Sequence, residues 1–212
     1  MTIVAAFAAI YVIWGSTYLA IRIGLESLPP FLLAGARFAV AGFVLYAWLR
    51  LRGVPRPTDA QWWSAALTGT LMLVGGVGGV TWAEQFVPSG VAALLVATLP
   101  MWMTVIDTST PRRSRADWRT VLGIGVGLTG VAVLVWPGNG GLASIHPIGA
   151  AVIVLGTLSW SVGSLRSRTA SLPNSPAMTV AVQMVSAGVV LLVISSALGE
   201  WQTGFAVSAV SG

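Results

Sequence analysis

Charged residues are scarce in this sequence, and thiols are missing altogether. It has no cysteine and no lysine, and charged residues make up 8% of its 212 residues. Without cysteine, neither a disulfide framework nor a thiolate metal site can form. Hydrophobic residues reach 56%, which leaves too little polar surface to coat a soluble globule. The composition therefore predicts an integral membrane protein.

Residues that usually carry catalysis or hold cofactors are also scarce. His146 is the single histidine, and it lies in a Pro/Gly-rich loop where we expect a solvated side chain. No group of His and carboxylate residues has the spacing of metal ligands, and no base stands where a serine nucleophile would need one. Most of the 11 basic residues lie in short loops, without a soluble domain to display a basic patch. We therefore expect no enzyme, no cofactor, no bound metal and no nucleic-acid partner.

Seven apolar stretches are long enough to cross about 30 Å of hydrocarbon at a rise of about 1.5 Å per residue. Proline and glycine separate nearly all of them. The predicted spans are residues 3–22, 31–50, 61–82, 88–106, 119–136, 147–165 and 177–198. Because the connections are short, successive helices should be antiparallel neighbours. The predicted fold class is an all-α integral membrane protein with about seven transmembrane helices.

The arginines predict the orientation of these helices. They gather after the second, fourth and sixth predicted spans, at Arg50, Arg52, Arg56, Arg112, Arg113, Arg115, Arg119, Arg166 and Arg168. These three connections share one side of the membrane, which the positive-inside rule assigns to the cytoplasm. We therefore expect a cytoplasmic N-terminus and, after seven spans, an outer C-terminus.

The segments around the first and the sixth span are similar to each other. An offset of 146 residues places Trp14 on Trp160, Pro30 on Pro176 and Arg37 on Gln183. Five spans separate the two copies, and an odd number turns the second copy upside down in the membrane. Inverted repeats are typical of secondary transporters, whose substrate path lies between the repeats near the bilayer midplane.

This repeat predicts the domain organisation. Residues 1–138 are expected to form a first unit of five helices, residues 147–198 the first two helices of an inverted second unit, and residues 199–212 an outer tail. Two complete units would need roughly 290 residues and ten spans. We therefore expect the chain to be a C-terminally shortened form of such a protein.

Several aromatic and hydroxyl side chains lie at mid-depth, where a lipid-facing surface does not require them. Trp14, Ser16, Thr17 and Tyr18 occupy the middle of the first span, and Trp160 the middle of the sixth. In an inverted repeat the two tryptophans would face each other across a central cavity. Aromatic walls with a few hydroxyls suit amphipathic or cationic organic solutes. The alternative is that these side chains pack between helices and bond to backbone carbonyls.

Charged residues inside or at the ends of spans are candidates for function by default. Arg37 lies inside the second span and Glu84 at the outer end of the third, so the two could pair. Such a pair would be either a structural bridge between hairpins or part of a substrate or gating site. Gln183 occupies the place of Arg37 in the second copy and joins the candidate substrate-binding residues. Asp107 is expected to be an interfacial residue.

The Gly-rich run at residues 74–79 is expected to serve helix packing. It lacks the GxxxxGK[ST] ending of a phosphate-binding loop. Gly75 and Gly79, like Gly123 and Gly127, have the small-xxx-small spacing that lets membrane helices approach closely.

Two long stretches resemble a known family. Residues 11–38 read YVIWGSTYLAIRIGLESLPPFLLAGARF, and residues 80–107 read VTWAEQFVPSGVAALLVATLPMWMTVID. Both resemble the EamA-type branch of the drug/metabolite transporter superfamily, particularly its YedA-like members. The resemblance extends through residues 123–135 into the sixth and seventh spans. It adds Trp82, in the motif segment 81–85, to the candidate substrate-binding residues. Val77 stands where the family commonly has an asparagine.

The resemblance implies a ten-helix inner-membrane protein of two inverted five-helix units that exports amino acids, metabolites or amphipathic compounds by alternating access. The hypothesis is therefore a transporter in the lipid bilayer, with a small-molecule solute as its partner. Both halves must move about a shared site, so a shortened chain would have to recruit a second copy or a separate complementing partner. The alternative is a truncated, non-transporting membrane fragment of such a transporter.

Overall fold

The computed structural model describes residues 2–108, 118–135 and 146–203, and every regular element within these ranges is a helix. The predicted all-α class is confirmed. The elements in chain order are α1 (Thr2–Leu25), α2 (Pro30–Leu51), α3 (Asp59–Gly69), η1 (Thr70–Gly78), α4 (Gly79–Ala83), α5 (Ser89–Val96), α6 (Leu99–Thr108), α7 (Trp118–Val135), α8 (Pro147–Ser167), α9 (Pro176–Ala197) and α10 (Glu200–Thr203).

Six helical segments are long and apolar enough to cross a membrane. They are Phe7–Leu25, Pro30–Leu51, Asp59–Ala83, Ser89–Asp107, Pro147–Ser167 and Pro176–Ala197, and each corresponds to one predicted span. The remaining prediction, residues 119–136, corresponds to α7, a helix of 18 residues outside this set of six. That α7 also spans the bilayer stays a prediction.

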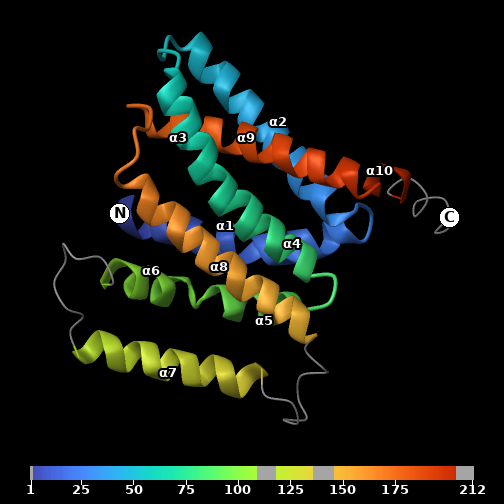
Figure 1. Cartoon of the computed structure of the whole chain (residues 1–212), viewed down its shortest axis with the longest axis vertical. Coiled ribbons are helices and arrows are strands. Elements are labelled where there is room, and N and C mark those ends of the chain that lie inside the picture. Colours follow the sequence, from blue (N-terminus) through green and yellow to red (C-terminus); the bar gives the residue numbers. More distant parts are fainter. Residues whose placement is uncertain (1, 109–117, 136–145, 204–212) are drawn as a thin grey trace.

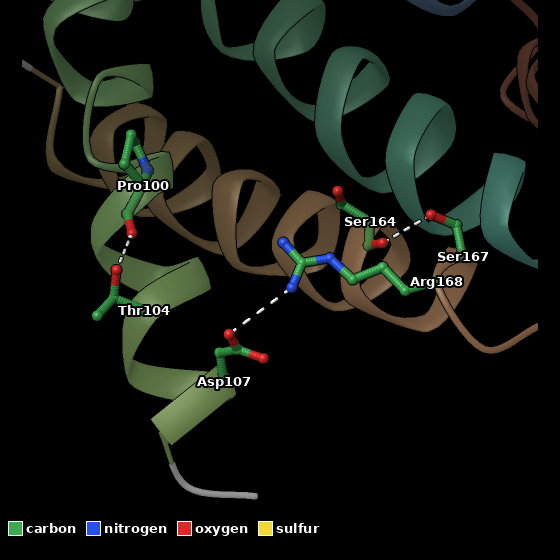
Figure 2. A network of polar contacts seen from close by, with 6 residues as sticks. All are labelled: Pro100, Thr104, Asp107, Ser164, Ser167 and Arg168. Carbon is green, nitrogen blue, oxygen red and sulfur yellow. Dashed lines mark hydrogen bonds and ion pairs between the residues drawn. The ribbon is translucent and has the colours of Figure 1, made fainter. Parts of the chain in front are cut away.

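Successive membrane-spanning helices run in alternating directions along the bundle. The C-terminal ends of α2, α6 and α8 lie toward the left or top of Figure 1, whereas those of α1, α4 and α9 lie toward the right. α1 and α8 therefore run in opposite directions. Asp107 at the end of α6 meets Arg168 after α8 at 3.6 Å (Figure 2), which places these two ends together. Arg112, Arg113 and Arg115 lie outside the described residues, and which side faces the cytoplasm stays a prediction.

Local signals explain where α2 and α9 begin and end. Pro30 and Pro176 each occupy the first helical position, where the missing N–H of proline costs nothing. Gly53 and Gly199 follow the two helices with φ of +79° and +71°, the left-handed conformation that glycine adopts without strain when it ends a helix. Both helices have 22 residues. They therefore match each other from end to end at the 146-residue offset.

The contacts between α2 and α9 follow the same offset. A Cβ atom added to Gly42 would lie 2.6 Å from the main-chain nitrogen of Val185. At the contact related to this one by the 146-residue offset, a Cβ atom on Gly188 would lie 2.5 Å from the main-chain nitrogen of Ala39. Reciprocal contacts of this kind are the property of a two-fold interface. The division into units 1–138 and 147–198 with a tail 199–212 stays a prediction, and residues 204–212 of that tail lie outside the described residues.

The third span is one rod made of α3, η1 and α4, and its centre is π-helical over nine residues. A side chain inserted into the hydrogen-bond ladder of a helix is one cause of such irregularity. Here Ser159 of α8 donates its hydroxyl to the Leu71 carbonyl at 2.7 Å. The fourth span is broken between α5 and α6 just before Pro100, since proline in a helix interior loses a hydrogen bond and clashes with the preceding turn.

Glycines let the third span approach α8 closely, as predicted for the Gly-rich run. A Cβ atom added to Gly75 would clash with the hydroxyl oxygen of Ser159, whereas one added to Gly79 would lie 3.5 Å from Cγ1 of Val152, an ordinary van der Waals distance. The close approach therefore requires glycine at Gly75 and not at Gly79. On α7 the second predicted pair behaves differently. Gly127 faces the sulfur of Met101, whereas a Cβ atom on Gly123 would meet no described atom within 4 Å.

Candidate functional site

A cavity of about 680 Å³ lies between α1, α2, the π-helical part of the third span and α8, with contributions from α4, α5, α6 and α9. This volume is within the range of small-molecule sites. Most of its lining is apolar. Five of the nine candidate substrate-binding residues line it, namely Trp14, Thr17, Tyr18, Arg37 and Trp160.

Trp14 and Trp160 face each other in the cavity wall. Their ring centroids are 6.5 Å apart with an interplanar angle of 26°, so the indoles are stacked. The ring of Trp160 packs against Gly76, where an added Cβ atom would lie 2.7 Å from its Cε3 atom. The predicted meeting of the two tryptophans is thus present in the structure. Their role in binding stays a prediction.

The hydroxyl groups of the lining come from both helices of the tryptophan pair. On α1, Thr17 donates to the Ile13 carbonyl at 2.8 Å. On α8, Thr157 donates to the Val154 carbonyl at 2.7 Å and lies 3.4 Å from the Thr98 hydroxyl. Thr157 is a lining residue that the sequence analysis missed. Its position three residues before Trp160, on the same face of a helix, is the signal that could have found it.

Arg37 supplies the charge of the cavity. The residue is exposed and lines the cavity, with its guanidinium carbon 4.9 Å from the centroid of the Phe38 ring. No ion pair joins it to a described residue. The pairing with Glu84 considered from the sequence is therefore wrong, because both Glu84 carboxylate oxygens are buried without a hydrogen-bond partner among the described residues.

Glu84 lies directly after the third span and is 0% exposed. Its main-chain carbonyl accepts a hydrogen bond from Nη1 of Arg22 at 2.7 Å. Burial raises the pKa of Glu84 to about 8, and the charges of Arg22 and Arg37 oppose this rise. At neutral pH most Glu84 carboxyls are thus protonated. Glu84 is not among the residues that line the cavity, and its role in binding stays a prediction.

The other three candidates also lie outside the lining. Ser16 is exposed and donates to the Ile13 carbonyl of its own helix at 3.1 Å. Trp82 packs edge-on against Phe86 with ring centroids 5.2 Å apart, and it lines a smaller pocket beside the turn between α1 and α2. Gln183 donates from Nε2 to the Thr68 hydroxyl at 3.0 Å and thereby links α9 to α3. These three residues lie outside the lining of this cavity, and their role in binding stays a prediction.

Val77 does line the cavity. An asparagine at this position would give the wall a polar group, and valine gives it an aliphatic one. The departure noted in the sequence therefore makes the cavity less polar.

The family model described as "EamA-like transporter family" matches residues 1–136. This chain belongs to the EamA-like transporter family. The match includes Trp14, Thr17, Tyr18 and Arg37 of the cavity, and the family inferred from the two motif stretches is confirmed.

Several curated relatives of this EamA-family chain are named as transporters. It is 44% identical over 197 residues to "Uncharacterized inner membrane transporter YedA" of Escherichia coli K12, covering 92% of this chain and 62% of the relative. It is 24% identical over 161 residues to "Uncharacterized transporter YoaV" of Bacillus subtilis, covering 76% and 55%. It is 28% identical over 222 residues to "Probable terminal-alkyne amino-acid exporter" of Streptantibioticus cattleyicolor, covering 94% and 74%. No solved structure matches.

The chain thus spans less than two thirds of the length of YedA and YoaV.

Proposed function

We propose that this EamA-family chain forms part of the solute path of an inner-membrane transporter that exports small metabolites, amino acids or amphipathic compounds. The observation that carries the proposal is the cavity of about 680 Å³ with the Trp14–Trp160 pair in its wall. Each tryptophan comes from the first helix of one predicted repeat. A solute held there lies between the two parts that must move relative to each other in alternating access.

Polar links at both ends of the bundle fit this mechanism. At one end, Asp107 in the last turn of α6 pairs with Arg168 after α8 (Figure 2). At the other end, the Glu200 carboxylate accepts the Leu32 N–H at 2.9 Å and the Phe31 N–H at 3.4 Å, at the start of α2. Each link joins the first predicted unit to the segment 147–203. Opening the cavity toward one side requires the link on that side to loosen.

The proposal includes the surroundings of the chain. The cell inner membrane is its location, with a cytoplasmic N-terminus, as the distribution of arginines favours. A small-molecule solute and the lipid bilayer are its partners. A second copy or a separate protein completes the moving halves, because alternating access needs both.

Transport assays on reconstituted vesicles test the proposal. The purified chain is placed in lipid vesicles loaded with a panel of radiolabelled amino acids, aromatic metabolites and dyes, and solute movement is compared with empty vesicles. We expect movement of at least one panel member, and Trp14→Ala should abolish it while leaving membrane insertion intact. Trp63→Ala, at an exposed indole, is the matched control and should keep the wild-type rate.

Thermal-shift measurements in detergent with the same panel separate binding from movement, since a bound solute raises the apparent stability. A solute that stabilises the wild type but not Trp14→Ala, without movement in vesicles, would support the alternative that this chain alone does not transport. Absence of both binding and movement for all solutes would refute the proposed function.

A further inference from the structure

The lining of the cavity carries positive charge and no negative charge among the described residues. Among the described lining residues, Arg37 is the sole ionisable group besides the Tyr18 phenol, and none is a carboxylate or a histidine. The carboxyl of Glu84 is fully buried and lies outside the lining. A guanidinium in an apolar wall without a paired anion is costly. The site is therefore built to gain an anion.

An anion bound at Arg37 would lie close to the two indoles of the cavity wall. Arg37 lies seven residues after Pro30, the start of α2, and Tyr18 lies seven residues before Leu25, the end of α1. The two are therefore at about the same depth below the turn that joins these helices. Trp14 lies four residues further along α1, or about 6 Å deeper. An anionic head at Arg37 and an apolar body against the indoles fit one small molecule.

We propose that the cavity binds an organic monocarboxylate, with its carboxylate on the guanidinium of Arg37 and its apolar or aromatic body against Trp14 and Trp160. This inference rests on the proposed function and names the substrate class. Arginine holds a carboxylate through two parallel hydrogen bonds, which neither a neutral amide nor an amine can reproduce. Aromatic rings accept the body without demanding a specific shape.

A cation or an amino-acid zwitterion is a poorer fit to the same cavity. An ammonium group needs acceptors, ideally a carboxylate, and the described lining supplies hydroxyls. The hydroxyls of Thr17 and Thr157 already donate to carbonyls of their own helices. A cation would in addition experience the like charge of Arg37. The site should therefore prefer the plain acid to the amino acid with the same side chain.

Calorimetric titration of the purified chain in detergent tests this with probes that share one body. The probes are 3-phenylpropionate, 3-phenylpropanamide, 3-phenylpropylamine and phenylalanine. The wild type should bind the acid about tenfold or more tightly than the amide, because a hydrogen bond between two charged groups is stronger than one to a neutral amide. The amine and phenylalanine should bind more weakly than the acid.

Variants of Arg37 test whether this residue causes the preference for the acid over the amide. Arg37→Gln should lower affinity for the acid to that for the amide, and unchanged amide binding shows that the variant is folded. Arg37→Lys keeps the charge without the planar fork and should keep part of the preference for the acid. It also serves as the test if Arg37→Gln cannot be purified. Arg52→Gln is the control. Its guanidinium also lies over a neighbouring ring, that of Trp48, but outside the cavity, so the preference should remain complete.

Three results would overturn the inference. They are equal binding of acid and amide by the wild type, an acid preference that survives in Arg37→Gln, and no binding of any probe at millimolar concentration. None of them refutes the proposed function, which the vesicle assay decides with its broader panel. A solute that moves in vesicles although acid and amide bind equally would leave transport in place and remove the carboxylate class.

Discussion

An alanine at Gly42 should weaken the packing of α2 against α9. The added Cβ would lie 2.6 Å from the main-chain nitrogen of Val185 and 2.8 Å from the Cβ of Met184. Non-bonded carbon atoms pack at about 3.5–4.0 Å, so the two helices must move apart by about 1 Å at this point. Overpacking of this kind costs about 1–3 kcal/mol. We expect the free energy of unfolding of Gly42→Ala to fall by that amount.

The reciprocal contact provides a second, independent variant. At Gly188 the added Cβ would lie 2.5 Å from the main-chain nitrogen of Ala39, and Gly188→Ala should cost about as much as Gly42→Ala. The double variant should cost less than the sum of the two. The separation of the helices that accommodates one methyl group also makes room for the other, and neighbouring sites are not additive.

Gly15→Ala is the matched control, because a Cβ atom at this helical position would meet no described atom within 4 Å. It should be neutral or stabilise by up to about 1 kcal/mol, since alanine favours helix over glycine. Unfolding by dodecyl sulfate titration in mild detergent, followed by tryptophan fluorescence and circular dichroism, measures the stability of all four variants relative to the wild type. If Gly42→Ala is as stable as Gly15→Ala, or if the two losses add fully, the reciprocal packing of α2 and α9 is refuted.

Three further changes test polar groups. Ser159→Ala removes the hydrogen bond to the Leu71 carbonyl and should cost about 0.6–2 kcal/mol in the same titration. Glu200→Gln removes the negative charge beside the Leu32 N–H and should cost about 0.3–1 kcal/mol at low salt and less at high salt. Burial raises the pKa of Glu84 from 4.5 to about 8, so the folded chain holds a proton that the unfolded chain releases. The free energy of unfolding should therefore decrease as the pH rises from about 4.5 to 8, and Glu84→Gln should remove this decrease.

Controls for these changes lie on α1 and the turn that follows it. Ser16→Ala removes an exposed hydroxyl that bonds within its own helix, so it should have a smaller effect than Ser159→Ala. Glu26→Gln, at an exposed carboxylate, should preserve both the salt dependence and the pH profile of the wild type. Equal effects of the two serine changes, a salt-independent loss in Glu200→Gln, or the same pH profile in wild type and Glu84→Gln would contradict the respective prediction.

The positions of α2 and α9 could be predicted because their signals are local. Proline at the first helical position and glycine after the last turn act through the backbone of their own segment. The offset that relates Pro30 to Pro176 also relates Trp14 to Trp160, so one comparison within the sequence was enough to predict that the indoles meet. The π-helical segment could not be predicted, since the hydrogen bond that accompanies it joins Ser159 to a carbonyl 88 residues away.

The sequence by itself determined the membrane environment, the order of the helices, the family and the offset of the internal repeat, because length, apolarity, proline and glycine act over a single helix. The tertiary structure decided which polar side chains share the cavity. In a membrane bundle both the lipid-facing and the buried surfaces are apolar, so no hydrophobic stripe specifies the rotation of a helix about its axis. That rotation places Arg37 and Thr157 in the lining and directs Gln183 to Thr68 instead. It leaves the carboxyl of Glu84 buried without a hydrogen-bond partner among the described residues.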